Sequence, residues 1–141
     1  MPDITISYPA IFMAVLNQFL LALVWYGVIF RHRWSHEIGV DPDVRPKKKV
    51  ITRGFGLMLV SVFLMAWVLA HTIAVWNPVT WGQQPSDQSL LLAVSAGFFT
   101  WLGFVVPVLL AAVAWGRKSW VYFAINGVYY LLGLVIMAIT I

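Results

Sequence analysis

One histidine, His71, lies inside a long apolar stretch and is the only side chain there that titrates near neutral pH. An ionisable residue in a membrane span is a functional candidate by default. Phe63 and Trp67 precede His71 at four-residue steps, which places the three rings on one helix face. An imidazole there could be the axial ligand of a tetrapyrrole pigment or a polar anchor for a lipid. The alternative is a structural hydrogen bond between helices, worth about 0.6–2 kcal/mol.

Other polar side chains lie at a similar depth. Asn17 and Gln18 in the first apolar stretch, together with Thr72, predict a polar layer in the outer half of the membrane. Trp67 and Trp101 lie well inside their stretches, away from the headgroup depth that tryptophan prefers. Packing between helices or against lipid tails explains these two rings, and lining a ligand pocket is the alternative. The candidate ligand-binding residues are therefore His71, Trp67, Asn17 and Trp101.

Other kinds of chemistry have little support. The chain has no cysteine, which excludes a thiolate nucleophile and a cysteine-based zinc or iron–sulfur site. The apolar stretches contain no Asp or Glu for an ion path, and no Ser–His–acid set can be assembled. His32 and His36 are four residues apart and precede Glu37, but Arg31 and Arg33 would repel a metal ion. We therefore predict no metal site and expect no catalytic residue.

Four apolar stretches must position these residues. The 141-residue chain is 62% hydrophobic and 10% charged, with mean hydropathy +0.88, whereas soluble domains are about 45–50% apolar and about 25% charged. A bilayer core about 30 Å thick needs about 20 apolar residues per helix, and a backbone in lipid must satisfy its own hydrogen bonds. The sequence predicts a single domain, an all-α four-helix transmembrane bundle with spans over 9–30, 54–76, 88–115 and 119–141.

The basic residues are sorted onto one side of the predicted bundle. They occur only in the loop 31–53 and at Arg117 and Lys118, so both basic segments are expected in the cytoplasm and both termini outside. Basic side chains beside a span attract anionic lipid by about 1 kcal/mol each. We therefore predict lipid contacts, and no nucleic-acid partner, for the basic cluster, which comprises Arg45, Lys47, Lys48, Lys49 and Arg53.

Small residues predict where helices approach one another. Ala66, Ala70 and Ala74 recur at four-residue spacing, and Ala93 and Gly97 form a second such pair. A bundle of four helices needs only part of this surface inside. We therefore expect a homo-oligomer or a subunit of a larger membrane complex.

Pro107 interrupts the third span. A proline removes one helical hydrogen bond and crowds the carbonyl four residues back, here that of Gly103, so we predict a kink at Pro107. Asn126, Tyr129 and Tyr130 lie at a comparable depth in the fourth span, and we predict that one of them packs against the kink. The predicted packing residues are Ala66, Ala70, Ala74, Gly97, Gly103, Pro107, Asn126 and Tyr130.

Three short segments carry a resemblance to a known family. They are residues 23–26 (Leu-Val-Trp-Tyr, with Trp34 following), 101–107 (Trp-Leu-Gly-Phe-Val-Val-Pro, with Gly97 ahead) and 125–130 (Ile-Asn-Gly-Val-Tyr-Tyr). Together they resemble the domain of unknown function 1761 family, small four-span bacterial membrane proteins, over the full length. This chain departs from the family in a longer basic loop and in lacking a polar tail. The resemblance implies the four-helix fold and a bacterial inner membrane, and it transfers no activity.

These observations leave three functional hypotheses. The leading one is a non-catalytic scaffold or accessory subunit that works through helix packing and lipid contact. The alternative is a membrane module that binds a hydrophobic ligand or pigment near His71, and a further alternative is a lipid-modifying enzyme. The membrane-associated eicosanoid and glutathione metabolism proteins also have four spans and a basic first loop, but their Glu-Arg and Asn pattern is missing from the second span here.

Overall fold

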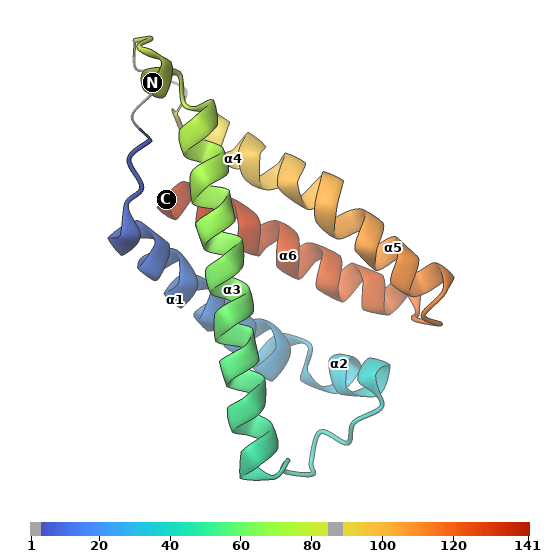
Figure 1. Cartoon of the computed structure of the whole chain (residues 1–141). Coiled ribbons are helices and arrows are strands. Elements are labelled where there is room, and N and C mark those ends of the chain that lie inside the picture. Colours follow the sequence, from blue (N-terminus) through green and yellow to red (C-terminus); the bar gives the residue numbers. More distant parts are fainter. Residues whose placement is uncertain (1–3, 85–88) are drawn as a thin grey trace.

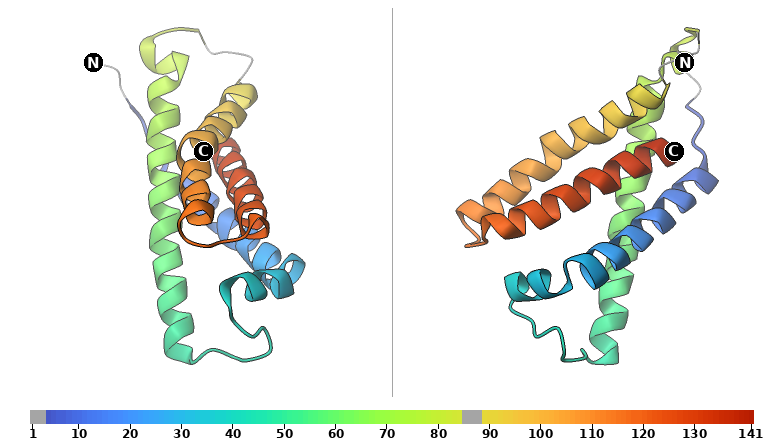
Figure 2. Two further views of the ribbon diagram at one scale, coloured as in Figure 1. Left: turned by 90° about the vertical axis from the view of Figure 1, so that its right-hand side faces the viewer. Right: turned by 180° about the vertical axis from the view of Figure 1, so that it is seen from behind.

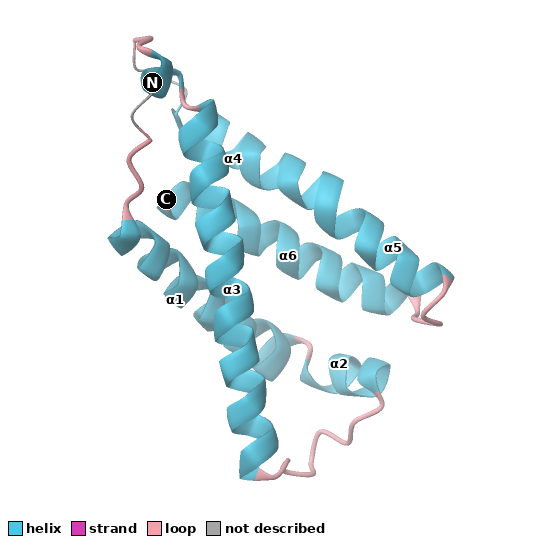
Figure 3. Ribbon diagram, in the orientation of Figure 1, coloured by secondary structure: helices cyan, strands magenta, loops and turns pink. Residues whose placement is uncertain are grey.

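Four long helical segments cross one another in the computed structural model (Figures 1 and 2), which describes residues 4–84 and 89–141. Those long and apolar enough to span a membrane are Tyr8–Ile29, Lys48–Trp76, Ser89–Ala114 and Trp120–Thr140. No strand occurs among the described residues (Figure 3). The prediction of an all-α protein with four spans is therefore confirmed. The predicted start of the third span, residue 88, lies outside the described residues.

The first span changes its helical pitch near its end. Helix α1 (Tyr8–Val24) begins at Ser7, whose side-chain oxygen accepts a hydrogen bond from the N–H of Ala10. The chain then widens into a π-helical turn, η1 (Trp25–Ile29), in which the N–H of Phe30 donates to the carbonyl of Trp25 at 2.8 Å. A short helix, α2 (Arg31–Ile38), follows at once and ends at Gly39, whose φ of +71° suits glycine.

Helix α3 (Lys48–Trp76) is longer than the span predicted for it. Its 29 residues reach about 43 Å, against a bilayer core of about 30 Å. It begins six residues before the predicted span, so Lys48 and Lys49 form its first turn. The basic end of α3 extends beyond the other helices in Figure 1. A short helix, η2 (Pro78–Trp81), follows α3 at its other end.

The third span consists of three pieces: α4 (Ser89–Thr100), the π turn η3 (Trp101–Val105) and α5 (Val106–Ala114). The π turn lies just before Pro107, and in it the N–H of Val106 donates to the carbonyl of Trp101. Pro107 itself is exposed in the first turn of α5, and a change of axis direction there stays a prediction. Gly103 is exposed as well, so in the monomer it is not one of the close-packed glycines.

Helix α6 (Trp120–Thr140) lies at the centre of the bundle. In its most apolar 18-residue stretch 44% of residues are buried, against 11% in the third span. It packs against α1, α3, α4 and α5. The core contains Ile11 of α1, Ala66 and Ala70 of α3, and Met137 of α6, whereas Ala74 is half-buried.

The closest approach between helices is at Gly97 of α4. A Cβ atom at this position would lie 2.9 Å from the carbonyl oxygen of Leu134 and 2.9 Å from the Cα of Val135, both in α6. Real Cβ atoms do not come this close to backbone, so the crossing of α4 and α6 requires glycine here. The small residue predicted at Gly97 lies at a helix crossing.

The two basic segments lie at the same end of the bundle. Ser119 precedes α6, and its Oγ accepts from the N–H of Tyr122 at 3.0 Å while donating to the Glu37 carboxylate of α2 at 2.5 Å. This pair of hydrogen bonds joins the loop 31–53 to the turn that contains Arg117 and Lys118. Figure 1 places the first residues of α1 and the C-terminal end of α6 toward the opposite end. Two basic segments on one side are what the charge pattern predicts, and their cytoplasmic location stays a prediction.

Candidate functional site

The end of the first span is hydrogen-bonded to the first half of α6. Trp25 and Tyr26 are the first two residues of η1. The indole N–H of Trp25 donates to the carbonyl of Ile125 at 3.1 Å, and the hydroxyl of Tyr26 donates to Oδ1 of Asn126 at 2.9 Å. The amide of Asn126 in turn donates to the carbonyl of Tyr122 at 2.8 Å. Both halves of the Asn126 side chain are therefore used, as a buried amide requires.

The third span is tied to the same turn of α6. Trp101, the first residue of η3, donates its indole N–H to the carbonyl of Gly127 at 2.7 Å. Each π turn therefore begins with a tryptophan whose indole donates to α6, at residues 125 and 127. The deep position of Trp101 thus serves helix packing. Short π turns occur frequently at functional sites, and both of these are hydrogen-bonded to segment 125–130 of α6.

An aromatic cluster surrounds these hydrogen bonds on the basic side of the bundle. The ring of Tyr26 lies 4.7 Å from that of Trp34 and 4.8 Å from that of Tyr129, measured between centroids. Trp34 also stacks on Tyr122 at 5.5 Å, and Tyr129 meets Tyr130 edge to face at 5.0 Å. Because Trp34 belongs to α2, this helix is held against α6 by stacking as well as by its hydrogen bond to Ser119.

Beside this cluster lies a cavity of about 750 Å³ between α1, α3 and α6, which we call the Gln18 cavity. Its volume lies within the range of about 300–1,000 Å³ that is typical of small-molecule sites. None of the described residues that line it is charged. They are Gln18, Phe19, Ala22, Leu23, Tyr26, Gly27, Trp34, Phe55, Leu57, Met58, Ser61, Val62, Met65, Tyr122, Asn126, Tyr129 and Tyr130.

Gln18 is the most buried polar residue of the cavity, with 1% of its surface exposed. Its Oε1 has no hydrogen-bond partner among the described residues. Gly133 of α6 leaves the space for this amide, since a Cβ at position 133 would overlap the Gln18 side chain. An unsatisfied buried polar group costs about 1–3 kcal/mol. The cavity therefore contains a buried acceptor that a hydrogen-bond donor would stabilise.

The polar layer predicted around His71 is not one connected site. Nδ1 of His71 lies 2.7 Å from the carbonyl of Trp67 in its own helix, and the two rings are 4.3 Å apart. Asn17 donates instead to the hydroxyl of Thr140 at 3.1 Å. The residues that line the Gln18 cavity do not include His71, Trp67, Asn17 or Thr140. Within residues 4–84 and 89–141, no group of three His, Asp or Glu is placed to hold a metal ion.

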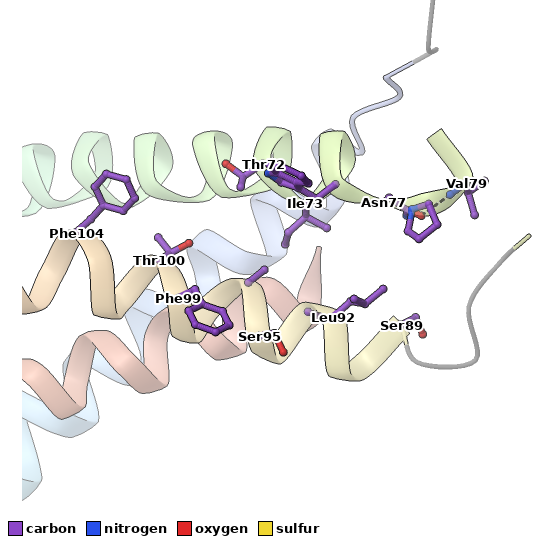
Figure 4. A pocket seen from close by; sticks show the side chains of 14 residues that line it. Thr72, Ile73, Asn77, Val79, Ser89, Leu92, Ser95, Phe99, Thr100 and Phe104 are labelled. Carbon is purple, nitrogen blue, oxygen red and sulfur yellow. Dashed lines mark hydrogen bonds between the residues drawn. The ribbon is translucent and has the colours of Figure 1, made fainter. Parts of the chain in front are cut away.

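A second groove, of about 560 Å³, lies between α3 and α4 (Figure 4). Two of its polar side chains are hydrogen-bonded within their own segments: the hydroxyl of Thr72 donates to the carbonyl of Val68 at 2.9 Å, and Oδ1 of Asn77 accepts from the N–H of Val79 at 3.0 Å. Because this groove offers no unpaired buried group comparable to Gln18, we place the candidate site in the Gln18 cavity.

The site residues that sequence reasoning missed are Tyr26, Trp34 and Gly133. The available signals were the Trp-Tyr pair at 25–26 and the Asn-Gly-Val-Tyr-Tyr segment, because both belong to the family resemblance. Neither segment indicates from its sequence that the two are in contact in the folded protein. The basic cluster is exposed at the free end of α3, away from the cavity. Lipid contact by its five side chains stays a prediction.

Comparison with known proteins gives one match. A family model described as "Protein of unknown function (DUF1761)" matches residues 9–141, nearly the whole chain. No curated protein and no solved structure matched. The match covers the three segments that meet around α6.

Proposed function

We propose that this chain, which belongs to the DUF1761 family, is a multi-pass membrane protein that binds an apolar ligand in the Gln18 cavity. The observation that carries the proposal is a buried, unpaired amide oxygen in an otherwise apolar and aromatic cavity of about 750 Å³. Ligand sites in proteins typically combine mostly apolar walls with a few polar groups that orient the ligand.

The rim of the cavity supports entry from the bilayer. Leu23 at the end of α1 is 52% exposed, and Phe55 and Leu57 near the basic end of α3 are 47% and 61% exposed. These side chains belong to the predicted spans 9–30 and 54–76, so in a membrane they would contact lipid near the basic end of the bundle. An apolar ligand can therefore reach Gln18 sideways from the bilayer without crossing water.

Native mass spectrometry in mild detergent tests this proposal. We expect the wild-type protein to retain a stoichiometric lipid-sized adduct. Met58→Trp, which fills the cavity from α3, is expected to lose that adduct. His71→Leu serves as the matched control in the same helix and is expected to retain it. An adduct that depends on His71 and tolerates Met58→Trp would contradict the proposal in favour of a His71 site, and the absence of any adduct would refute both.

A second candidate function is that of a subunit in a homo-oligomer or a larger membrane complex. The chain exposes 9908 Å², against about 7,400 Å² expected for a compact soluble chain of 15.9 kDa. The third span is the least buried of the four, with 11% of its apolar stretch buried. Lipid covers such a surface as readily as another subunit does. The same native spectra decide between them, since an oligomer appears at a multiple of the chain mass.

The orientation we propose places the basic end in the bacterial cytoplasm, where the basic cluster contacts anionic lipid headgroups. Because the chain has no cysteine, single-cysteine variants report the topology without background. In intact cells a membrane-impermeant maleimide is expected to label Gln83→Cys, and to label Lys48→Cys only after permeabilisation. Labelling of Lys48→Cys in intact cells would reverse the orientation.

A further inference from the structure

We infer that the Gln18 cavity selects an uncharged lipid that carries a free hydroxyl group, a lipid alcohol of the diacylglycerol type. This inference rests on the proposed function and specifies the chemistry of its ligand. Three properties of the cavity support it: the charge of its walls, the unpaired acceptor of Gln18 and the tyrosine hydroxyls around it.

The walls of the cavity favour an uncharged ligand. All of its described lining residues are neutral. At its edge, Nζ of Lys118 lies 5.3 Å from the centroid of the Tyr122 ring, and Lys118 is not one of the lining residues. A phosphate or carboxylate moved into such an environment would lose its hydration without gaining a counter-ion, which is strongly unfavourable. Phospholipid headgroups are therefore expected to stay at the membrane surface, near the basic cluster.

The polar groups of the cavity specify a hydroxyl. Oε1 of Gln18 is an acceptor without a partner among the described residues, and a donor on the ligand would satisfy it. An amine would bring a positive charge, and the walls hold no anion to balance it. Asn126 does not compete for the ligand, because Tyr26 and the Tyr122 carbonyl already occupy its amide. A neutral O–H group is the donor that satisfies both conditions.

The oxygen of that hydroxyl, or an adjacent ester carbonyl, also needs a donor. Tyr129 and Tyr130 line the cavity and carry hydroxyls that can supply it. Met58 and Met65 of α3 form the facing wall, and their unbranched side chains adapt to acyl chains of irregular shape. The arrangement matches a lipid whose hydroxyl and ester groups lie at Gln18 while its chains leave past Leu23 and Phe55 toward the bilayer.

Photolabelling with three matched lipids tests the inference on the full chain in phosphatidylcholine vesicles. Each lipid carries the same diazirine-bearing acyl chains: a diacylglycerol, its acetate ester, which lacks the hydroxyl, and the corresponding phosphatidic acid, which adds a charged phosphate. Labelled peptides are mapped by mass spectrometry. We expect the diacylglycerol to label the cavity peptides about fivefold more than the other two, the factor that one net hydrogen bond gives.

Two variants examine the residues. Gln18→Met keeps the length of the side chain and removes the acceptor, so diacylglycerol labelling is expected to fall to the level of the acetate. Tyr130→Phe removes one hydroxyl and is expected to lower labelling in part, whereas His71→Leu leaves it unchanged. Equal or stronger labelling by phosphatidic acid, or an unchanged preference in Gln18→Met, would overturn the inference and leave the proposed function standing. If no lipid labels the cavity peptides, both fall.

Discussion

Replacing Gly97 with alanine is expected to lower the unfolding temperature of the purified protein by about 10 °C, from a loss of roughly 2–3 kcal/mol. The new methyl group would meet the backbone of Leu134 and Val135 at 2.9 Å. Backbone in the middle of a helix cannot rotate away, so α4 and α6 must separate along their contact. The measurement is thermal unfolding in detergent, followed by circular dichroism.

Gly103→Ala is the matched control for this experiment. It lies six residues further along the same span, and within the described part of the chain no atom lies within 4 Å of the Cβ it would gain. Alanine is about 1 kcal/mol more favourable than glycine in a helix, so this variant is expected to unfold at the same temperature or slightly higher. Equal unfolding temperatures for the two variants would show that α4 does not cross α6 at Gly97.

Gly133→Ala is expected to have the opposite pattern: about a fivefold loss of diacylglycerol labelling, equivalent to about 1 kcal/mol, with a change in unfolding temperature below about 3 °C. Its Cβ would overlap the amide of Gln18, which is the end of a flexible side chain and can turn aside. The bundle therefore remains assembled while the acceptor leaves its position.

Gly127→Ala controls for the general effect of adding a methyl group to α6. Its Cβ would lie 3.8 Å from Cδ1 of Leu109, an ordinary contact, and its carbonyl still accepts from Trp101. Both labelling and unfolding temperature are expected to match the wild type. If Gly133→Ala kept full labelling, the position of the Gln18 amide would not matter for the ligand.

The spans and the placement of the basic segments were predictable because they depend on local composition. Membrane helices must be apolar over a fixed length, and the sorting of Lys and Arg shows which ends lie together. The early start of α3 was not predictable from hydropathy. Lys48 and Lys49 are excluded from the bilayer core but not from a helix, so hydropathy marks where α3 enters the membrane and not where it begins.

The candidate site was harder to predict than the fold. His71 stands out in the sequence as a lone titratable group, but its ring bonds to its own helix. Which side chains meet depends on how each helix is rotated, and a span that is apolar all round leaves that rotation unspecified. Gln18 was placed in a shared polar layer, whereas its surroundings are set by Gly133, more than 100 residues later in the chain, and by the aromatic cluster.

The unpaired oxygen of Gln18 is expected to lower the stability of the folded protein. A methionine at this position would fill the same volume without an unpaired oxygen, so Gln18→Met is expected to be at least as stable as the wild type. A polar group that lowers stability is more easily explained by ligand binding than by folding. This separates Gln18 from Asn126, whose amide oxygen and nitrogen both have partners and serve the packing of η1 on α6.

The two π turns set the phase of the helices that contain them. A hydrogen bond from residue i+5 encloses one residue more than an α-helical turn, and each residue of an α-helix advances the chain by about 100°. The extra residue in η3 therefore turns α5 by about that angle relative to α4, which brings Leu109 to the buried side. In the first span η1 does the same for the residues that lead into α2. In the first and third spans, the helix before the π turn and the helix after it therefore have independent rotations about the axis. Removing one residue from either π turn would rotate the following helix and change which of its side chains are buried, while the preceding helix stays in place.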